Sequence, residues 1–353
     1  MSNIPELAWK KYLTREYSFL YISYAVDCYK IMMQKVGATI KFDLAHGEDD
    51  LVSLYGINEE FENCYEQINQ LLSTDLKKGL QMMDEFEELM KRYYSLVEKI
   101  DDCENKSDLK ELLIELDGTF LNLLCYYLFF VYLGYGGDKP AIAKFLEENK
   151  ERFEKLRNCG VDSHMDKEFP HLFGKFNNKF ESLISYMSRK DLLNLLEDKE
   201  LNLEKINQRK KEYLLVTKDG ITKEYESPEI RKTLLQEVSE LKHLDEINEL
   251  KGRTACQGVV RGKVTIIHTM KDYPKIKEGD IIVTPMTKPS ITTLLSKVKG
   301  IITNDGGALC HASIISREMN IPCVVGTIHA TEVLKDGDEV LLDANSGIVK
   351  KLN

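Results

Sequence analysis

The apolar residues of the chain change their spacing near residue 250, and this change predicts two domains of different fold class. Before it, apolar residues recur at intervals of three and four, as they do on one face of an α-helix. After it, short β-rich runs such as KVTIIH and DIIVTP alternate with glycine-bearing turns. A chain of 353 residues is long enough for two domains. We therefore expect an α + α/β chain: a mostly helical domain over 1–245, a linker over 246–252 and a compact β/β/α domain over 253–353.

Long helices make up most of the expected first domain. The helical spacing is found in five segments: Leu7–Val36, Glu59–Ser73, Leu76–Ile100, Lys106–Leu133 and Pro140–Asn158. An irregular segment, which contains FPHLFGKFNN, is expected over Val161–Asn178. Shorter helices follow at Phe180–Asp198, Leu203–Lys211 and Pro228–Leu241. A small hairpin is expected over 213–225, because Asp219-Gly220 between apolar runs is a strong turn signal.

Residues 118–137 carry no charge and reach the length of a membrane span. Asn122, Cys125 and several tyrosines dilute the apolar character, however, and the flanking charges are Asp117 and Asp138 rather than a basic cluster. We therefore expect a buried helix and no membrane association.

The overall composition indicates a cytoplasmic protein. The eight cysteines form no C-x-x-C pair, which predicts free thiols in a reducing compartment and no metal site. The N-terminal residues lack the apolar core of a secretory signal. The net charge is −10, but residues 251–353 hold 14 Lys and Arg against 10 Asp and Glu. The acidic remainder argues against nucleic acid as a partner, whereas the mildly basic end suits a segment that handles phosphate.

The segment Gly300–Thr327, GIITNDGGALCHASIISREMNIPCVVGT, has the pattern of a buried strand, a Gly-Gly turn and a helix. His311 is expected in the first turn of that helix, whose apolar face would be formed by Ile314, Ile315 and Met319. Free N–H groups and the helix dipole stabilise an anion at such a position. A neutral imidazole is also a competent nucleophile towards phosphorus. A lone histidine beside a glycine turn is more often a surface residue or cap, so the local spacing alone leaves both interpretations open.

The complete string resembles the swivelling phosphohistidine domain of phosphoenolpyruvate-utilising enzymes. This family includes phosphoenolpyruvate synthase, pyruvate phosphate dikinase, enzyme I of the sugar phosphotransferase system and rifampicin phosphotransferase. The run T-N-x-G-G-x-x-C-H-A-x-I-I-x-R-E-x-x-I-P-x-V-V-G is similar to the synthase version. Further matching segments spread the resemblance over residues 252–353: Gly258–Gly262, Glu278–Val283, Thr287-x-Pro289, Asp336–Val340, Asp343 and Gly347–Val349.

The resemblance implies roles for particular residues. His311 would carry the phosphoryl group, Thr303 would hydrogen-bond its imidazole, and Arg317 would steady the helix or the phosphate. Gly306, Gly307 and Cys310 would shape the phosphate site. The chain departs from the synthase pattern where Asp305 and Ala308 replace arginines and Leu309 replaces a hydroxyl residue.

A helical domain followed by a phosphohistidine domain resembles the later part of rifampicin phosphotransferase. This resemblance implies that the helical domain binds a small-molecule acceptor. His171 in the segment FPHLFGKF, and His164 shortly before it, are candidate contacts to this acceptor. An aromatic cluster could line an apolar pocket, although ordinary core packing is the better explanation for most of its members: Tyr126, Tyr127, Phe129, Phe130, Tyr132 and Tyr135.

Neither an ATP-grasp pattern nor a substrate barrel is recognisable in these residues. We therefore expect that no cofactor is bound by this chain. Its donor, ATP or phosphoenolpyruvate, would be used by a separate ATP-grasp protein resembling the N-terminal part of pyruvate phosphate dikinase, and Mg²⁺ would be bound at that partner. The alternative is a non-catalytic phosphocarrier or regulatory module whose helical domain docks a protein.

Overall fold

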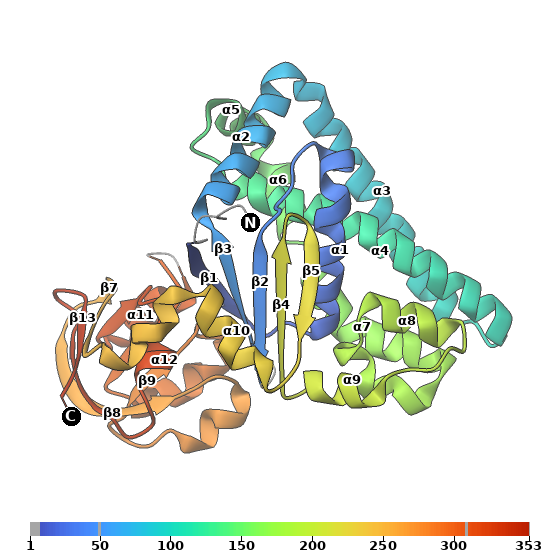
Figure 1. Cartoon of the computed structure of the whole chain (residues 1–353). Helices are drawn as coiled ribbons and strands as arrows, with labels where there is room; N and C mark the ends of the chain where they lie inside the picture. Colours follow the sequence, from blue (N-terminus) through green and yellow to red (C-terminus); the bar gives the residue numbers. More distant parts are fainter. Residues whose placement is uncertain (1–7, 49–50, 308–309, 353) are drawn as a thin grey trace, which may run out of the picture. The chain divides into compact units, whose positions relative to one another are not determined.

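The computed structural model describes residues 8–48, 51–307 and 310–352. It divides into two compact units (Figure 1). Unit 1 contains Glu16–Leu234, and unit 2 contains Ala8–Arg15 together with Leu235–Asn353. Unit 2 thus begins before the expected linker and also takes in a short N-terminal segment. That segment is a strand, β1 (Trp9–Arg15), in which the side chains of Trp9 and Lys11 are buried.

Unit 1 is mainly helical, as the sequence predicts. Its two longest helices, α3 (Leu76–Asp101) and α4 (Lys106–Tyr135), pack along one another. Asp75 and Asn105 cap them by accepting backbone N–H groups of the first turn. The other helices are α1 (Phe19–Val36), α2 (Asn58–Thr74), α5 (Pro140–Glu148), α6 (Lys150–Arg157), α7 (Val161–Phe176), α8 (Arg189–Leu196), α9 (Leu203–Arg209) and the 3-10 helix η1 (Asn178–Tyr186).

Four antiparallel strands of unit 1 lie side by side in the order β3, β2, β4, β5. They are β2 (Asp43–Glu48), β3 (Leu51–Ile57), β4 (Glu212–Lys218) and β5 (Ile221–Tyr225). The hairpin expected over 213–225 is confirmed as β4 and β5, and its turn residue Gly220 has a φ of 75°. Because β2 and β3 are short and lie between long helices, the sequence pattern did not reveal the rest of the sheet.

Two secondary-structure assignments from the sequence are wrong. The helix expected over Leu7–Val36 begins only at Phe19, since the alternating residues before Ser18 form β1. The segment Val161–Asn178, expected to be irregular, is helix α7 with Pro170 inside it. Its apolar side chains include Met165, Phe169 and Phe173, all fully buried. Packing of this apolar face therefore outweighs the proline.

The uncharged stretch 118–137 lies mostly in α4, which is the one helix of the described residues long and apolar enough to cross a membrane. Within its most apolar window, 72% of the residues are buried inside the fold. Phe120, Phe129 and Phe130 are completely buried. The expectation of a buried core helix is confirmed.

Unit 2 contains an eight-stranded mixed sheet in the order β6, β13, β12, β8, β9, β10, β11, β7. Its strands are β6 (Glu249–Lys251), β7 (Arg253–Cys256), β8 (Val259–Ile266), β9 (Ile281–Thr284), β10 (Gly300–Thr303), β11 (Cys323–Val325), β12 (Glu339–Asp343) and β13 (Ile348–Lys351). Helices α11 (His311–Met319) and α12 (Ala330–Val333) follow β10 and β11. Helix α10 (Glu229–Glu237) spans the sequence boundary between the two units, and the 3-10 helix η2 (Ser239–Glu246) belongs to unit 2. The 3-10 helices η3 (Met270–Lys275) and η4 (Pro289–Lys297) complete unit 2.

The expected linker over 246–252 is part of the fold of unit 2. Strand β6 pairs with β13, and Leu250 is buried in the same core cluster as Val340 and Leu342. Two apolar clusters cover the sheet, and α11 packs beside β7, β10 and β11. The expected α + α/β class is confirmed, with the domain boundary shifted towards the N-terminus.

Candidate functional site

The loops that surround His311 follow three neighbouring parallel strands. β9, β10 and β11 run in the same direction, so their carboxyl ends meet at one edge of the sheet. Residues 285–287 follow β9, and residues 304–310 follow β10 and lead into α11. Ligand sites in α/β sheets are commonly found at this edge, because side chains from several loops converge there.

His311 is the first residue of α11 and is partly exposed. Its Nδ1 atom lies 2.8 Å from Oγ1 of Thr287. When Nδ1 carries the ring proton, it donates to the threonine oxygen, and Nε2 keeps its lone pair. Thr287 can thereby hold the tautomer and the ring orientation in which Nε2 is the nucleophile.

The residue that contacts the imidazole differs from the one expected. Thr303 is completely buried, and its hydroxyl donates to the backbone carbonyl of Asp305 at 2.6 Å. Its own carbonyl accepts both the N–H and the hydroxyl of Thr327. Thr303 therefore shapes the loop, while Thr287 supplies the contact to His311. The match of Thr287-x-Pro289 to the family was the signal that could have identified this threonine.

The glycine turn before α11 is closed by short hydrogen bonds. Gly306 has a φ of 128°, and a Cβ atom there would lie 2.9 Å from the sulfur of Cys310. The carbonyl of Gly307 accepts the N–H of Cys310 and the hydroxyl of Ser313. The amide of Cys310 is thus already paired, which leaves the first-turn amides of α11 to face an anion. Gly306, Gly307 and Cys310 remain candidate phosphate neighbours through the shape of this turn.

Arg317 lies in the last turn of α11, six residues after His311. At 1.5 Å per residue the two Cα atoms are about 9 Å apart along the helix axis. A cation at that end complements the helix dipole, which favours the helix-steadying role. Ile314 is 45% exposed rather than part of the apolar face, whereas Ile315 and Met319 pack against the core.

Strand β1 brings one cation to the loop before His311 and a second one to α12. Arg15 pairs with the Asp305 carboxylate at 2.8 Å, and the N–H of Thr14 donates to the same carboxylate. Lys11, whose side chain is almost fully buried, pairs with Glu332. Glu332 in turn accepts from Asn304, the residue after β10. Asp305 therefore has a cationic partner within unit 2. Ala308 and Leu309, the other two departures from the family pattern, lie outside the described residues.

Two of these carboxylates have shifted pKa values. Burial raises the pKa of Asp305 above its ordinary value, although Arg15 acts in the opposite direction. Burial also opposes ionisation of Glu332, but the Lys11 ammonium holds its pKa below the ordinary value. Sequence reasoning missed this cluster because Lys11 and Glu332 are 321 positions apart.

The acceptor contacts expected in the helical domain do not form one site. Phe130 is completely buried and Tyr126 is 5% exposed, and the Tyr126 hydroxyl donates to Glu85, so both belong to the core. His171 is exposed and lies 3.5 Å from an Asp101 carboxylate oxygen.

The other expected histidine has polar partners. His164 Nε2 is 3.0 Å from the Tyr94 hydroxyl, and its Nδ1 is 3.0 Å from Glu168. The hydroxyl of Tyr93 donates to the same carboxylate. This arrangement satisfies His164 within the helical packing of α3 and α7.

A family model, PEP-utilising enzyme, mobile domain, matches residues 276–347. Those residues include Thr287, the glycine turn and His311. Unit 2 carries a PEP-utilising enzyme mobile domain. The resemblance predicted from the T-N-x-G-G-x-x-C-H string is confirmed, and with it the assignment of a swivelling phosphohistidine domain.

Relatives of this mobile domain are similar over the same part of the chain. A probable phosphoenolpyruvate synthase of Methanothermobacter thermautotrophicus is 49% identical over 100 residues, which are 28% of this chain and 15% of that protein. The phosphoenolpyruvate synthase of Pyrococcus furiosus is 42% identical over 123 residues, 34% of this chain and 15% of that protein. The chain therefore spans about one seventh of the length of these relatives.

Among solved structures, the solution structure of Enzyme I (nEIt) is 15% identical and covers 78% of this chain and 79% of that chain, with a TM-score of 0.20. The aconitase X of Thermococcus kodakaraensis is 21% identical and covers 30% of this chain and 98% of that chain, with a TM-score of 0.24. These scores are too low to bear on the fold.

Proposed function

We propose that this chain is a phosphotransferase component that relays a phosphoryl group through phospho-His311 to an acceptor bound by unit 1. The observation that carries this proposal is the 2.8 Å contact between Thr287 Oγ1 and His311 Nδ1 at the start of α11. It leaves Nε2 as the nucleophilic nitrogen beside amides that can stabilise phosphate. The similarity of the mobile domain to phosphoenolpyruvate synthases supports phosphoryl transfer as the reaction class.

The relay has two displacement steps. In the first, the Nε2 lone pair forms an N–P bond as the P–O bond of the donor breaks. In the second, an acceptor oxygen bonds to phosphorus as the N–P bond breaks, and the proton of that oxygen passes to solvent. Positioning and charge stabilisation provide most of the catalysis in such transfers.

The phosphoryl donor is assigned to a partner. A separate ATP-grasp or phosphoenolpyruvate-using protein would charge His311 and would hold the Mg²⁺ and the nucleotide. The proposal supposes no cofactor bound by the 353 residues themselves. A non-catalytic carrier whose unit 1 docks a protein is the competing function, and a partly open pocket in unit 1 favours the enzyme.

Labelling of His311 tests the relay. Purified protein is incubated with β- or γ-labelled ATP or labelled phosphoenolpyruvate, with and without extract of the source cells. We expect an acid-labile, base-stable label that requires the extract. His311→Ala should abolish it completely, whereas His268→Ala, at an exposed position of unit 2, should retain it. Label on the His311→Ala variant would refute the relay, and a stable labelled chain with no transfer to small molecules would favour the carrier.

A further inference from the structure

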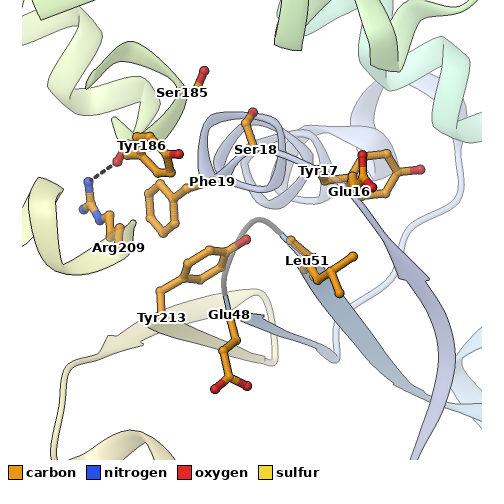
Figure 2. A pocket seen from close by; sticks show the side chains of 11 residues that line it. Glu16, Tyr17, Ser18, Phe19, Glu48, Leu51, Ser185, Tyr186, Arg209 and Tyr213 are labelled. Atoms are coloured by element: carbon orange, nitrogen blue, oxygen red, sulfur yellow. Dashed lines mark hydrogen bonds between the residues drawn. The ribbon is translucent and has the colours of Figure 1, made fainter. Parts of the chain in front are cut away.

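A pocket of about 200 Å³ lies within unit 1, away from the residues expected to contact an acceptor. Figure 2 shows that its wall is assembled from four separate segments. They contribute residues around the start of α1, the ends of β2 and β3, the end of η1, and the α9–β4 junction: Glu16–Phe19, Glu48, Leu51, Val52, Ser185, Tyr186, Arg209 and Tyr213. A volume of this size accommodates one ring with a few substituents.

Tyr213 is the residue that marks this pocket as a binding site. Its side chain is 5% exposed, and its hydroxyl has no hydrogen-bond partner among the residues that the structure describes. In Figure 2 the hydroxyl points between Phe19 and Leu51, into the space between the lining residues. A buried hydroxyl without a partner is unfavourable in a folded protein, so its persistence points to a ligand that pairs with it.

The Tyr213 ring is held firmly, so this orientation is built into the fold. Gly47 is its cross-strand neighbour, and a Cβ atom at Gly47 would lie only 2.1 Å from the ring. Phe19 packs edge-on against the other side, with ring centroids 4.7 Å apart. The ring cannot turn the hydroxyl away without disturbing both contacts.

Burial and the nearby Asp166 raise the pKa of the Tyr213 hydroxyl well above its ordinary value. The hydroxyl is therefore protonated at neutral pH and can donate a hydrogen bond. A ligand that fills the pocket would offer an oxygen or nitrogen acceptor at this point.

The charges of the lining disfavour anions. Arg209 is the cation of the pocket, but its guanidinium is paired with Asp191 and Glu224 and stacks on Phe19. Glu16 and Glu48 add two exposed carboxylates. Among the described lining residues, no uncommitted cation would balance the negative charge of a ligand carboxylate or phosphate, whereas an amine would be attracted.

We propose that this pocket binds a small ring compound that carries a hydroxyl group and no negative charge, and that Tyr213 donates a hydrogen bond to it. The ring lies against Phe19, Tyr186 and Tyr213, and an amino substituent is attracted by the net negative charge of the lining. That this compound is the phosphoryl acceptor rests on the proposed function. Binding itself does not require phosphoryl transfer.

Three probes of the same size test the proposal on the full chain: 4-hydroxybenzylamine, 4-hydroxybenzyl alcohol and 4-hydroxybenzoate. Binding is measured by calorimetry and by ligand-observed NMR. We expect the amine and the alcohol to bind, and the benzoate to bind at least tenfold more weakly. Equal binding of the benzoate, or binding of none of the three, would overturn the proposal.

Tyr213→Phe separates a ligand contact from a structural role. It should weaken the amine and the alcohol about three- to tenfold, the loss expected for one hydrogen bond. It should leave the melting temperature unchanged or raise it, because it removes an unpaired buried hydroxyl. Unchanged binding, or a lower melting temperature, would contradict the assignment. Tyr135→Phe, whose side chain is 59% exposed outside the pocket, is the matched control and should alter neither value.

The two proposals can fail separately. His311→Ala should still bind the probes although it takes up no label. If the probes bind but His311 of the wild type takes up no label, the relay is refuted and the pocket proposal is supported. If His311 is labelled but no probe binds, the relay is supported and the pocket proposal is refuted.

Discussion

The two units of this protein present their candidate sites in different ways. In unit 2 the glycine turn, the proposed nucleophile His311 and the serine that donates to the Gly307 carbonyl lie within Gly306–Ser313, and Thr287 comes from another loop. In unit 1 the pocket combines four segments that range from Glu16 to Tyr213. A site formed within one loop and helix leaves a recognisable string in the sequence. A site formed by packing leaves none, because each of its residues looks ordinary in its own segment.

Unit 2 also contains long-range contacts, which the cations of β1 make. From the other end of the chain, Arg15 pairs with Asp305 in the loop before His311, and Lys11 pairs with Glu332 in α12. The mobile domain thus forms ion pairs with a strand that is distant in the sequence, although most residues of its candidate site are near one another in the chain. Substitutions can test how far each unit relies on such long-range contacts.

The largest effect is expected for Lys11→Met. The Lys11 side chain is 2% exposed, and the substitution would leave Glu332 without its cation. Breaking a buried ion pair in this way typically costs 3–5 kcal/mol, and we expect about 3 kcal/mol because Glu332 is still partly exposed. Chemical denaturation of the full chain, followed by hydrogen exchange in α12, measures the loss. A change of less than about 0.5 kcal/mol would mean that β1 is dispensable to unit 2.

The pH dependence of stability provides the control for the Lys11 substitution. The folded pKa of Glu332 lies below its ordinary value of 4.5. Its contribution is therefore fully present above that value and is lost as the pH falls through the folded pKa. Lys11→Met should lack this acid-sensitive component. Replacing both Lys11 and Glu332 by Met should recover much of the stability lost in the single variant.

Gly47→Ala should have the next largest effect, and in unit 1. The added Cβ would meet the Tyr213 ring at 2.1 Å, so the ring or β2 must move. Overpacking of this kind costs about 1–3 kcal/mol and would also disturb the pocket. Thermal unfolding and probe binding should both decline. Gly118→Ala is the matched control, because a Cβ there meets no atom within 4 Å and the helix should gain stability.

Thr287→Val addresses the orientation of the nucleophile. Loss of Oγ1 removes the hydrogen bond to Nδ1, so we expect phosphorylation of His311 to slow about tenfold, which corresponds to roughly 1.4 kcal/mol. The initial rate of label uptake measures this effect under the conditions used for wild type. Thr287→Ser keeps the hydroxyl and should restore most of the rate. An unchanged rate in the valine variant would assign the threonine to packing alone.

The smallest effect is expected for the Arg15–Asp305 pair. The two side chains are 31% and 20% exposed, so water screens their attraction. A double-mutant cycle with Arg15→Ala and Asp305→Ala should give a coupling of about 0.5–1 kcal/mol. Asp305→Ala alone should cost more than Arg15→Ala, because it also leaves the N–H of Thr14 without this acceptor. Strictly additive effects would show that the pair does not tie β1 to the loop.

Much of the architecture could be predicted from residue patterns. Capped amphipathic helices such as α3, the Asp219-Gly220 hairpin and the alternation of strands and helices in unit 2 follow from local preferences. β1 and α7 were misassigned for different reasons. In β1 the alternation is short and adjoins a true helix, and in α7 tertiary packing of Phe169 and Phe173 overrides Pro170.

The sequence by itself determined the mobile domain and predicted His311 as its phosphorylated residue, because the proposed nucleophile and the glycine turn before it are neighbours in the chain. Only the tertiary structure decided that Thr287 rather than Thr303 contacts the imidazole, since Thr303 ends β10 and Thr287 follows the parallel strand β9 at the same edge of the sheet. It also decided that Lys11 and Arg15 belong to unit 2 and that Tyr213 faces a pocket. These features depend on which distant segments pack together, and residue spacing along the chain carries no record of that packing.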